Sequence, residues 1–337
     1  MKQLLQRRIA LTLIGIGLIL TAVGFLLGGK EYVAYANLND FSLKGKQTVQ
    51  KIELIKEPLK DFQELDVRLD VANFTIEPSN DEYAYLSYLS TNRDIASTLR
   101  YQEKDGTLVL EKTRSQNFFI DISFFNNLFN PTGIGQSDQL GITLYLPEKM
   151  LDTVSIHVEV GTATLSHLQA KQAKISVESG KLVLTDTTFA TLKARNEVGN
   201  TTFKQNTIDE LTFQSESGNL ILEENTLHAG TIHSEFGNMT LDNSQFNNTQ
   251  FKTESGTIKG QHVTFTGENN LKSEYGDITL GLTKSTLQDT HFFLQTEHGK
   301  VSVPNLTGKQ TTTSFESNQK AQHIFNATIE SGNITIE

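Results

Sequence analysis

Apolar and polar positions repeat with a fixed period in the C-terminal half of the chain. The tripeptide Glu-x-Gly occurs nine times there, beginning at Glu159, Glu178, Glu197, Glu216, Glu235, Glu254, Glu274, Glu297 and Glu330. The first six copies are 19 residues apart, and intervals of 20, 23 and 33 residues follow. A period of this length is typical of repeat architectures, in which each unit buries its apolar face by stacking on its neighbours.

Each unit places apolar residues at fixed distances from its Glu. Positions −3, +4 and +6 are apolar in nearly every unit, with Thr201 at +4 and Gly260 at +6 as exceptions. Positions +4 and +6 differ by two, the period of a strand with one buried face, and the Gly at +2 suits a tight corner. We therefore predict an all-β fold, a single-stranded parallel β-solenoid with three-sided coils of about 19 residues, stacked about 4.8 Å apart.

The repeat has a weaker copy further upstream. Val67, Asp70, Asn73, Phe74 and Ile76 match positions −3, 0, +3, +4 and +6. We therefore expect an N-terminal β cap with degenerate coils in residues 51–150, followed by the solenoid repeats in 151–337. The strands expected in the cap are Lys51–Ile55, Glu64–Leu69, Phe74–Glu77, Ala84–Ser90, Thr107–Lys112 and Ile142–Leu146. Residues 309–322 are expected to be a polar loop inserted into the last coil.

The N-terminal segment is predicted to anchor the chain in a membrane. Residues 9–29 carry no charge and would span roughly 31 Å as a helix, about one bilayer core. Lys2, Arg7 and Arg8 precede this run, which favours a cytoplasmic tail at 1–8, a linker at 30–50 and an extracellular remainder. The alternative is secretion after cleavage near Ala36, because Ala34-Tyr35-Ala36 resembles a signal-peptidase site.

Composition excludes several function classes. The chain has no cysteine, so a disulfide framework, a thiolate metal site and a cysteine nucleophile are all ruled out. Beyond residue 30 the chain has 25 Lys and Arg against 39 Asp and Glu, a net charge of −14. Such a surface repels nucleic acid and attracts cationic partners. We expect no cofactor.

These strand and turn patterns resemble a known family. The Leu65-Asp66-Val67 and Ala72-Asn73-Phe74-Thr75-Ile76 strands, the Ile142–Pro147 strand and the Glu-x-Gly coils are similar to the bacterial putative-adhesin family DUF4097, found in exported proteins of Gram-positive bacteria. The resemblance covers about residues 50–337. It implies a surface role and supplies no catalytic residues.

The stacked glutamates allow two interpretations. Carboxylates in one column would repel one another at about 4.8 Å. The interpretation that we favour is that each Glu accepts hydrogen bonds from backbone N–H groups at its own corner or in the next coil. The alternative is a calcium-binding ridge formed by Glu159, Glu178, Glu197, Glu216, Glu235 and Glu254.

An aromatic cluster is the second candidate site. Five phenylalanines fall within residues 117–130, namely Phe118, Phe119, Phe124, Phe125 and Phe129. They are predicted either to cover the first coil as a plug, which we favour, or to form an exposed patch for the membrane or a partner.

Catalysis is not expected. Arg195 is the only arginine after residue 150, and the aspartates of the repeats fall at differing positions, so they do not stack into one site. The sequence therefore predicts a non-enzymatic, membrane-tethered binding protein of the cell envelope, with a role in envelope interaction or stress response and an unknown envelope or protein ligand. A purely structural envelope protein and a polysaccharide-active enzyme are the alternatives.

Overall fold

The computed structural model describes residues 36–37, 42–43, 52–53, 58–90, 99–112, 141–317 and 321–337. The chain divides into two compact units, Met1–Val49 and Gln50–Glu337. In the first unit, β1 (Ala36–Asn37) and β2 (Ser42–Leu43) form an antiparallel pair. Within the described residues no helix is long and apolar enough to cross a bilayer, and the predicted span at 9–29 lies outside them.

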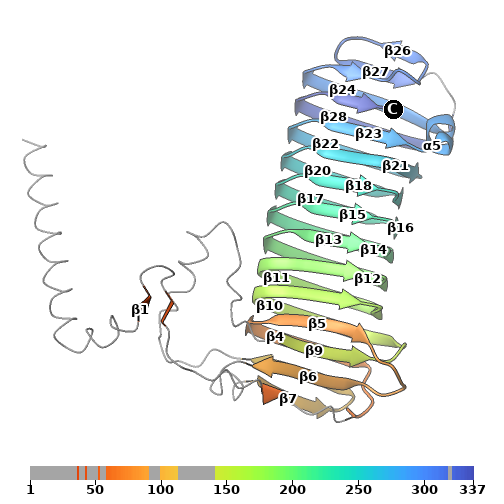
Figure 1. Cartoon of the computed structure of the whole chain (residues 1–337). Helices are drawn as coiled ribbons and strands as arrows, with labels where there is room; N and C mark the ends of the chain where they lie inside the picture. Colours follow the sequence, from red (N-terminus) through yellow and green to blue (C-terminus); the bar gives the residue numbers. More distant parts are fainter. Residues whose placement is uncertain are drawn as a thin grey trace, which may run out of the picture. The chain divides into compact units, whose positions relative to one another are not determined.

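The second unit is all-β and consists of stacked coils (Figure 1). Residues of β10 pair in parallel with residues 19 positions later in β11, as the repeat predicts, with Asp152 and Glu159 as the exceptions. One coil shows the three predicted sides as the separate strands β17, β18 and β19. The strands of the stack are β10 (Met150–Ser166), β11 (Gln169–Thr185), β12 (Thr188–Val198), β13 (Thr201–Lys204), β14 (Thr207–Ser217), β15 (Leu220–Glu223), β16 (Thr226–Leu227), β17 (Gly230–Phe236), β18 (Met239–Asp242), β19 (Gln245–Asn247), β20 (Thr249–Ser255), β21 (Ile258–Thr266), β22 (Glu268–Tyr275), β23 (Ile278–Leu282), β24 (Thr290–His298), β25 (Val301–Ser302), β28 (His323–Ser331) and β29 (Ile334–Ile336). A short helix, α5 (Lys284–Asp289), connects β23 to β24.

The core runs along the inside of the stack. Positions −3, +4 and +6 face inward, and in the second repeat Ile175, Leu182 and Leu184 are at most 1% exposed. Each side chain buried in this way stabilises the fold by roughly 1.5–3 kcal/mol. Position +11 is also internal, where the rings of Phe246 and Phe265 stack at 5.6 Å in successive coils.

Glycine is required at the corner after each Glu. Gly180 has φ of +146°, a region that side chains rarely adopt, and a Cβ there would lie 1.7 Å from the carbonyl oxygen of Gly161 in the coil below. The corner therefore excludes any side chain for two independent reasons, conformation and space. The same conditions recur at most of the other Glu-x-Gly corners.

A column of buried polar side chains lies at a second corner of the coils, after the strand that follows the glycine corner. The backbone amide of Thr187 donates to the side-chain oxygen of Asn206, and the amide of Asn206 donates in turn to that of Asn225, each at 3.0 Å. Ser244 continues the column by accepting from the amide of Asn225 at 3.0 Å. These side chains are at most 1% exposed, so each bond satisfies a backbone group that water cannot reach.

The N-terminal cap consists of two further coils and their antiparallel cover. The predicted strands agree closely with the structure, and the upstream copy of the repeat is confirmed because Val67 pairs with Ile156 and Phe74 with Ala163. Strand β7 was not predicted from the sequence. The strands of the cap are β3 (Ile52–Glu53), β4 (Glu64–Val71), β5 (Asn73–Pro78), β6 (Tyr85–Ser90), β7 (Leu99–Lys104), β8 (Thr107–Lys112) and β9 (Gly141–Leu146).

The coils at both ends are stacked out of sequence order. The first coil, β4 and β5, lies between β10 and the later strands β8 and β9. At the other end, the last coil, β28 and β29, lies between the coil of β22 and β23 and the earlier coil of β24 and β25. The repeat pattern implies that the coils stack in the order of the sequence. This expectation is wrong at the C-terminal end.

Antiparallel strands cover both outermost coils. At the N-terminal end β7 pairs with β8, and β6 pairs with β9. At the C-terminal end β27 (Ser314–Ser317) pairs with β24, and β26 (Gly308–Gln310) pairs with β27 (Figure 1). The segment predicted to be a polar loop at 309–322 thus contributes two strands to the sheet. These strands cover parallel edges that would otherwise pair with other chains.

Candidate functional site

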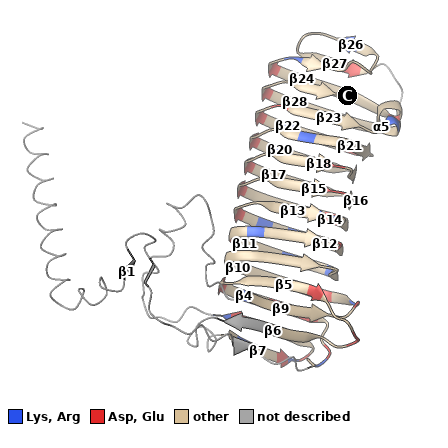
Figure 2. Ribbon diagram, in the orientation of Figure 1, with Lys and Arg blue, Asp and Glu red and all other residues tan. Residues whose placement is uncertain are grey.

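The glutamates of the repeat form a column on the outside of the stack. They fall along one edge, where each strand reaches its glycine corner (Figure 2). The side chains of Glu178 and Glu216 are 47% and 50% exposed, so the column faces solvent. We call this column the Glu ladder; it comprises the nine glutamates of the repeat, from Glu159 to Glu330.

Basic residues lie two positions before the Glu in five of the coils, and Arg195 forms ion pairs with two glutamates of the Glu ladder. Residues two apart on a strand share a face, so position −2 lies beside the Glu of its own and the next coil. Arg195 Nη2 is 2.8 Å from Glu216 Oε1 and 3.1 Å from Glu197 Oε1, and His157 Nε2 is 3.5 Å from Glu178 Oε1. The basic residues at this position are His157, Arg195, His233, Lys252 and Lys272. This pairing was not predicted, although the spacing of two residues is visible in the sequence.

Asparagine, and not glutamate, supplies the hydrogen bonds of the glycine corner. Asn200 Oδ1 accepts from the backbone amide of Asn219, and Asn219 Oδ1 accepts from that of Asn238, both at 3.0 Å. Within the described residues no glutamate of the Glu ladder accepts a backbone hydrogen bond. The favoured interpretation of the Glu ladder is therefore wrong. The Asn side chain at +3 is the one that reaches the backbone of the next coil.

Calcium binding by the Glu ladder stays a prediction. The part of the chain that the structure describes contains no group of three or more His, Asp or Glu side chains able to hold a metal ion. Ca²⁺ needs six to eight oxygen ligands, and one glutamate per coil supplies two.

Exposed apolar side chains line the same corner at position +1. Val160, Val198, Phe236 and Tyr275 are 42%, 53%, 54% and 58% exposed. They occupy every second coil and alternate with serines, so successive members lie about 9.6 Å apart. We call these four residues the corner ridge. Single exposed apolar residues are ordinary, but these four form a regular series beside the Glu ladder.

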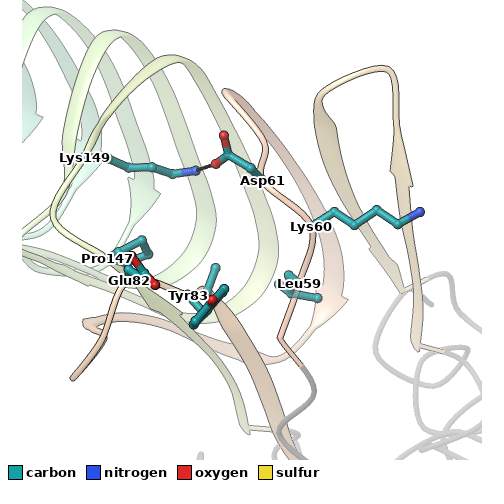
Figure 3. A pocket seen from close by; sticks show the side chains of 8 residues that line it. Leu59, Lys60, Asp61, Glu82, Tyr83, Pro147 and Lys149 are labelled. Carbon is teal, nitrogen blue, oxygen red and sulfur yellow. Dashed lines mark hydrogen bonds and ion pairs between the residues drawn. The ribbon is translucent and has the colours of Figure 1, made fainter.

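A cavity of about 470 Å³ lies in the N-terminal cap (Figure 3). Its main polar contact is between Lys149, in the turn before β10, and Asp61, with Nζ 2.6 Å from Oδ1. The same Nζ donates to the carbonyl oxygen of Phe62 and lies 4.4 Å from the centroid of its ring. The hydrogen bond from Lys149 lowers the pKa of Asp61 below its usual value. Lys149 Nζ thus contacts a carboxylate, a carbonyl oxygen and an aromatic ring. We interpret these contacts as a latch, which holds the segment before β4 against the turn before β10.

The predicted aromatic cluster lies in a part of the chain that the structure does not describe. Phe118, Phe119, Phe124, Phe125 and Phe129 all lie outside the described residues. The plug and the exposed patch therefore both stay predictions.

The fold and surface define a class: all-β repeat proteins whose stacked coils present a long, regular exterior. Within this class, the chain belongs to the Toastrack DUF4097 family, whose model matches residues 62–337. The family resemblance is thereby confirmed. Among proteins with curated functions, none matches the chain.

Solved structures show similar but distant folds. One is described as a putative adhesin from Bacteroides fragilis, with 14% identity, a TM-score of 0.43 and coverage of 86% of this chain and 97% of that chain. Another is a putative lipid binding protein from Parabacteroides distasonis, with 15% identity, a TM-score of 0.49 and coverage of 86% and 96%. A putative adhesin from the same species has 12% identity, a TM-score of 0.47 and coverage of 86% and 98%. Likenesses this distant carry no argument about function.

Proposed function

We propose that the protein is a non-enzymatic, adhesin-like binding protein of the bacterial cell envelope, and that it binds through the glycine corner of its solenoid. The observation that carries this proposal is the corner ridge. Four large apolar side chains stay exposed there, although serine fills the same position in the coils between them. A purely structural stack would gain nothing from exposing Phe236 and Tyr275 to water.

The charge beside the corner ridge indicates the chemistry of the partner. The Glu ladder runs next to the corner ridge, and a net charge of −14 beyond residue 30 extends the acidic field. An envelope polymer or protein that combines basic groups with an apolar face complements both features. A nucleic acid would be repelled by the same field.

Membrane tethering is part of the proposal. Residues 9–29 would form a single span with the N-terminus in the cytoplasm, leaving the second unit extracellular. Cleavage near Ala36 would release the same unit instead. An adhesin-like role is what the names of two of the similar structures describe for those proteins; here it is proposed from the chain's own surface.

Three outcomes of one experiment separate the candidate functions. The purified full-length chain is incubated with isolated bacterial envelope fragments and sedimented, and the supernatant is analysed for released sugar. We expect the chain to sediment with the fragments and to release none. No sedimentation would support a purely structural protein, and release of soluble saccharide would support a polysaccharide-active enzyme.

A further inference from the structure

A second cavity lies at the C-terminal end of the stack, on its outer face. It measures about 500 Å³, within the range of small-molecule sites. Strands β24, β26, β27 and β28 form it, where the antiparallel hairpin of β26 and β27 extends the parallel sheet. The side chains that line the cavity include those of Phe293, Gln295, Asn326, Thr328, Ser314 and Glu316.

Strand register arranges these side chains in two rows. In the first row Phe293 lies between Asn326 of β28 and Glu316 of β27. In the second row Gln295 lies between Thr328 and Ser314. The cavity thus offers the exposed ring of Phe293 beside amide, hydroxyl and carboxylate groups and the ammonium group of Lys309, all on strands and therefore held in fixed relative positions.

The aromatic ring is exposed and held in place. Phe293 is 41% exposed, and the ring of His291 contacts it edge to face at a centroid distance of 4.3 Å. His291 is itself held by Ser317, whose Oγ is 3.3 Å from its Nδ1, and by Glu316, whose Oε1 is 3.8 Å from its Nε2. A ring that is already ordered loses little entropy when a ligand stacks on it.

We propose that this cavity binds a neutral pyranose unit of an oligosaccharide. The C–H face of a pyranose is apolar and would stack on Phe293, while its hydroxyls would exchange hydrogen bonds with Gln295, Thr328 and Ser314. A wholly apolar ligand would leave those amide and hydroxyl groups unpaired, at a cost in affinity. Lys309 and Glu316 both line the cavity, so their opposite charges favour a neutral ligand over an anion or a cation.

This inference goes beyond the proposed function. The cavity is formed by the outer faces of the last strands, whereas the corner ridge ends at Tyr275 and lies at the glycine corners. The protein could bind envelope through the corner ridge without binding sugar in this cavity. It could equally bind sugar in this cavity without binding envelope through the corner ridge.

Calorimetric titration of the full-length chain with chitotriose, cellotriose and maltotriose tests the proposal. At least one trisaccharide binds the wild type, and Phe293→Ala weakens it tenfold or more, whereas Phe293→Tyr retains it. Phe236→Ala, on the corner ridge, serves as the matched control and leaves sugar binding unchanged. Gln295→Ala, at an exposed polar position, provides a second variant whose folding does not depend on the Phe293 ring.

Two results would overturn the proposal: no binding of any of the three sugars, or equal binding by wild type and by folded Phe293→Ala and Gln295→Ala variants. Sedimentation with envelope fragments is measured on the same samples. If sugar binding fails while sedimentation persists, the cavity proposal falls and the proposed function stands.

Discussion

Single residues decide how tightly the coils can stack. At the glycine corner the backbone of each coil passes directly over the carbonyl of the coil below, so position +2 cannot carry a side chain. The sequence predicted this glycine correctly, because glycine repeated at fixed spacing marks a backbone position with no room for a Cβ. The predicted hydrogen bond of the neighbouring Glu was wrong, because a fixed position in the repeat does not show which side chain reaches the next coil. In the folded chain Asn219 and its equivalents do so.

Replacing a corner glycine is expected to destabilise the stack. In Gly218→Ala the backbone would be held at φ of +138° at a cost of about 1–3 kcal/mol, and the new Cβ would lie 2.0 Å from the carbonyl oxygen of Gly199. The melting temperature should therefore fall clearly. Gly141→Ala is the control, because it has no positive φ and no heavy atom within 4 Å of the added Cβ. Equal melting of both variants would contradict the account of the corner.

At the scale of elements, strands were predictable and their order was not. Alternation of apolar residues located β4, β5, β8 and β9, because the buried face of a strand depends on local sequence. Neighbours in a parallel sheet depend on contacts distant in sequence, so nothing in the pattern shows that the last coil lies inside the one before it. The polar composition of the 33-residue interval also concealed β26, an exposed edge strand, and β27, a short strand in which only Phe315 and Ser317 are buried.

The latch between cap and stack should respond to acid. Lys149 lowers the pKa of Asp61, so the contribution of this pair to stability is present above the unfolded value of 3.8 and is lost as the pH falls through the lowered pKa. Asp61→Asn should melt at a slightly lower temperature than wild type at neutral pH, because Asp61 is largely exposed and such pairs are weak. The difference should shrink below pH 3.8.

The control for the latch is Asp289→Asn, whose carboxylate makes no ion pair with the described residues. Its melting curve should follow that of the wild type across the same pH range. A difference between wild type and Asp61→Asn that persists unchanged in acid would show that Asp61 acts through something other than its charge.

At the scale of the whole molecule, repetition converts single positions into extended surfaces. One Glu per coil becomes the Glu ladder, and one exposed apolar residue in every second coil becomes the corner ridge. The Glu ladder was visible in the sequence, but the corner ridge was not, because the exposure of position +1 follows from a corner at which two successive side chains both face outward. The cavity near Phe293 depends on the out-of-order coils and was equally beyond prediction.

The most direct test of the proposed function compares envelope binding by wild type and by the double variant Phe236→Ser, Tyr275→Ser. Serine is the residue that neighbouring coils carry at this position, at Ser217 and Ser255, so the melting temperature should stay unchanged. Ile221→Ser, which removes an exposed apolar side chain from another side of the coil, is the control. We expect the double variant to bind envelope fragments at least about tenfold more weakly, a loss of about 1.4 kcal/mol, and the control to bind like wild type. Full binding by the folded double variant would contradict the assignment of the corner ridge as the binding surface.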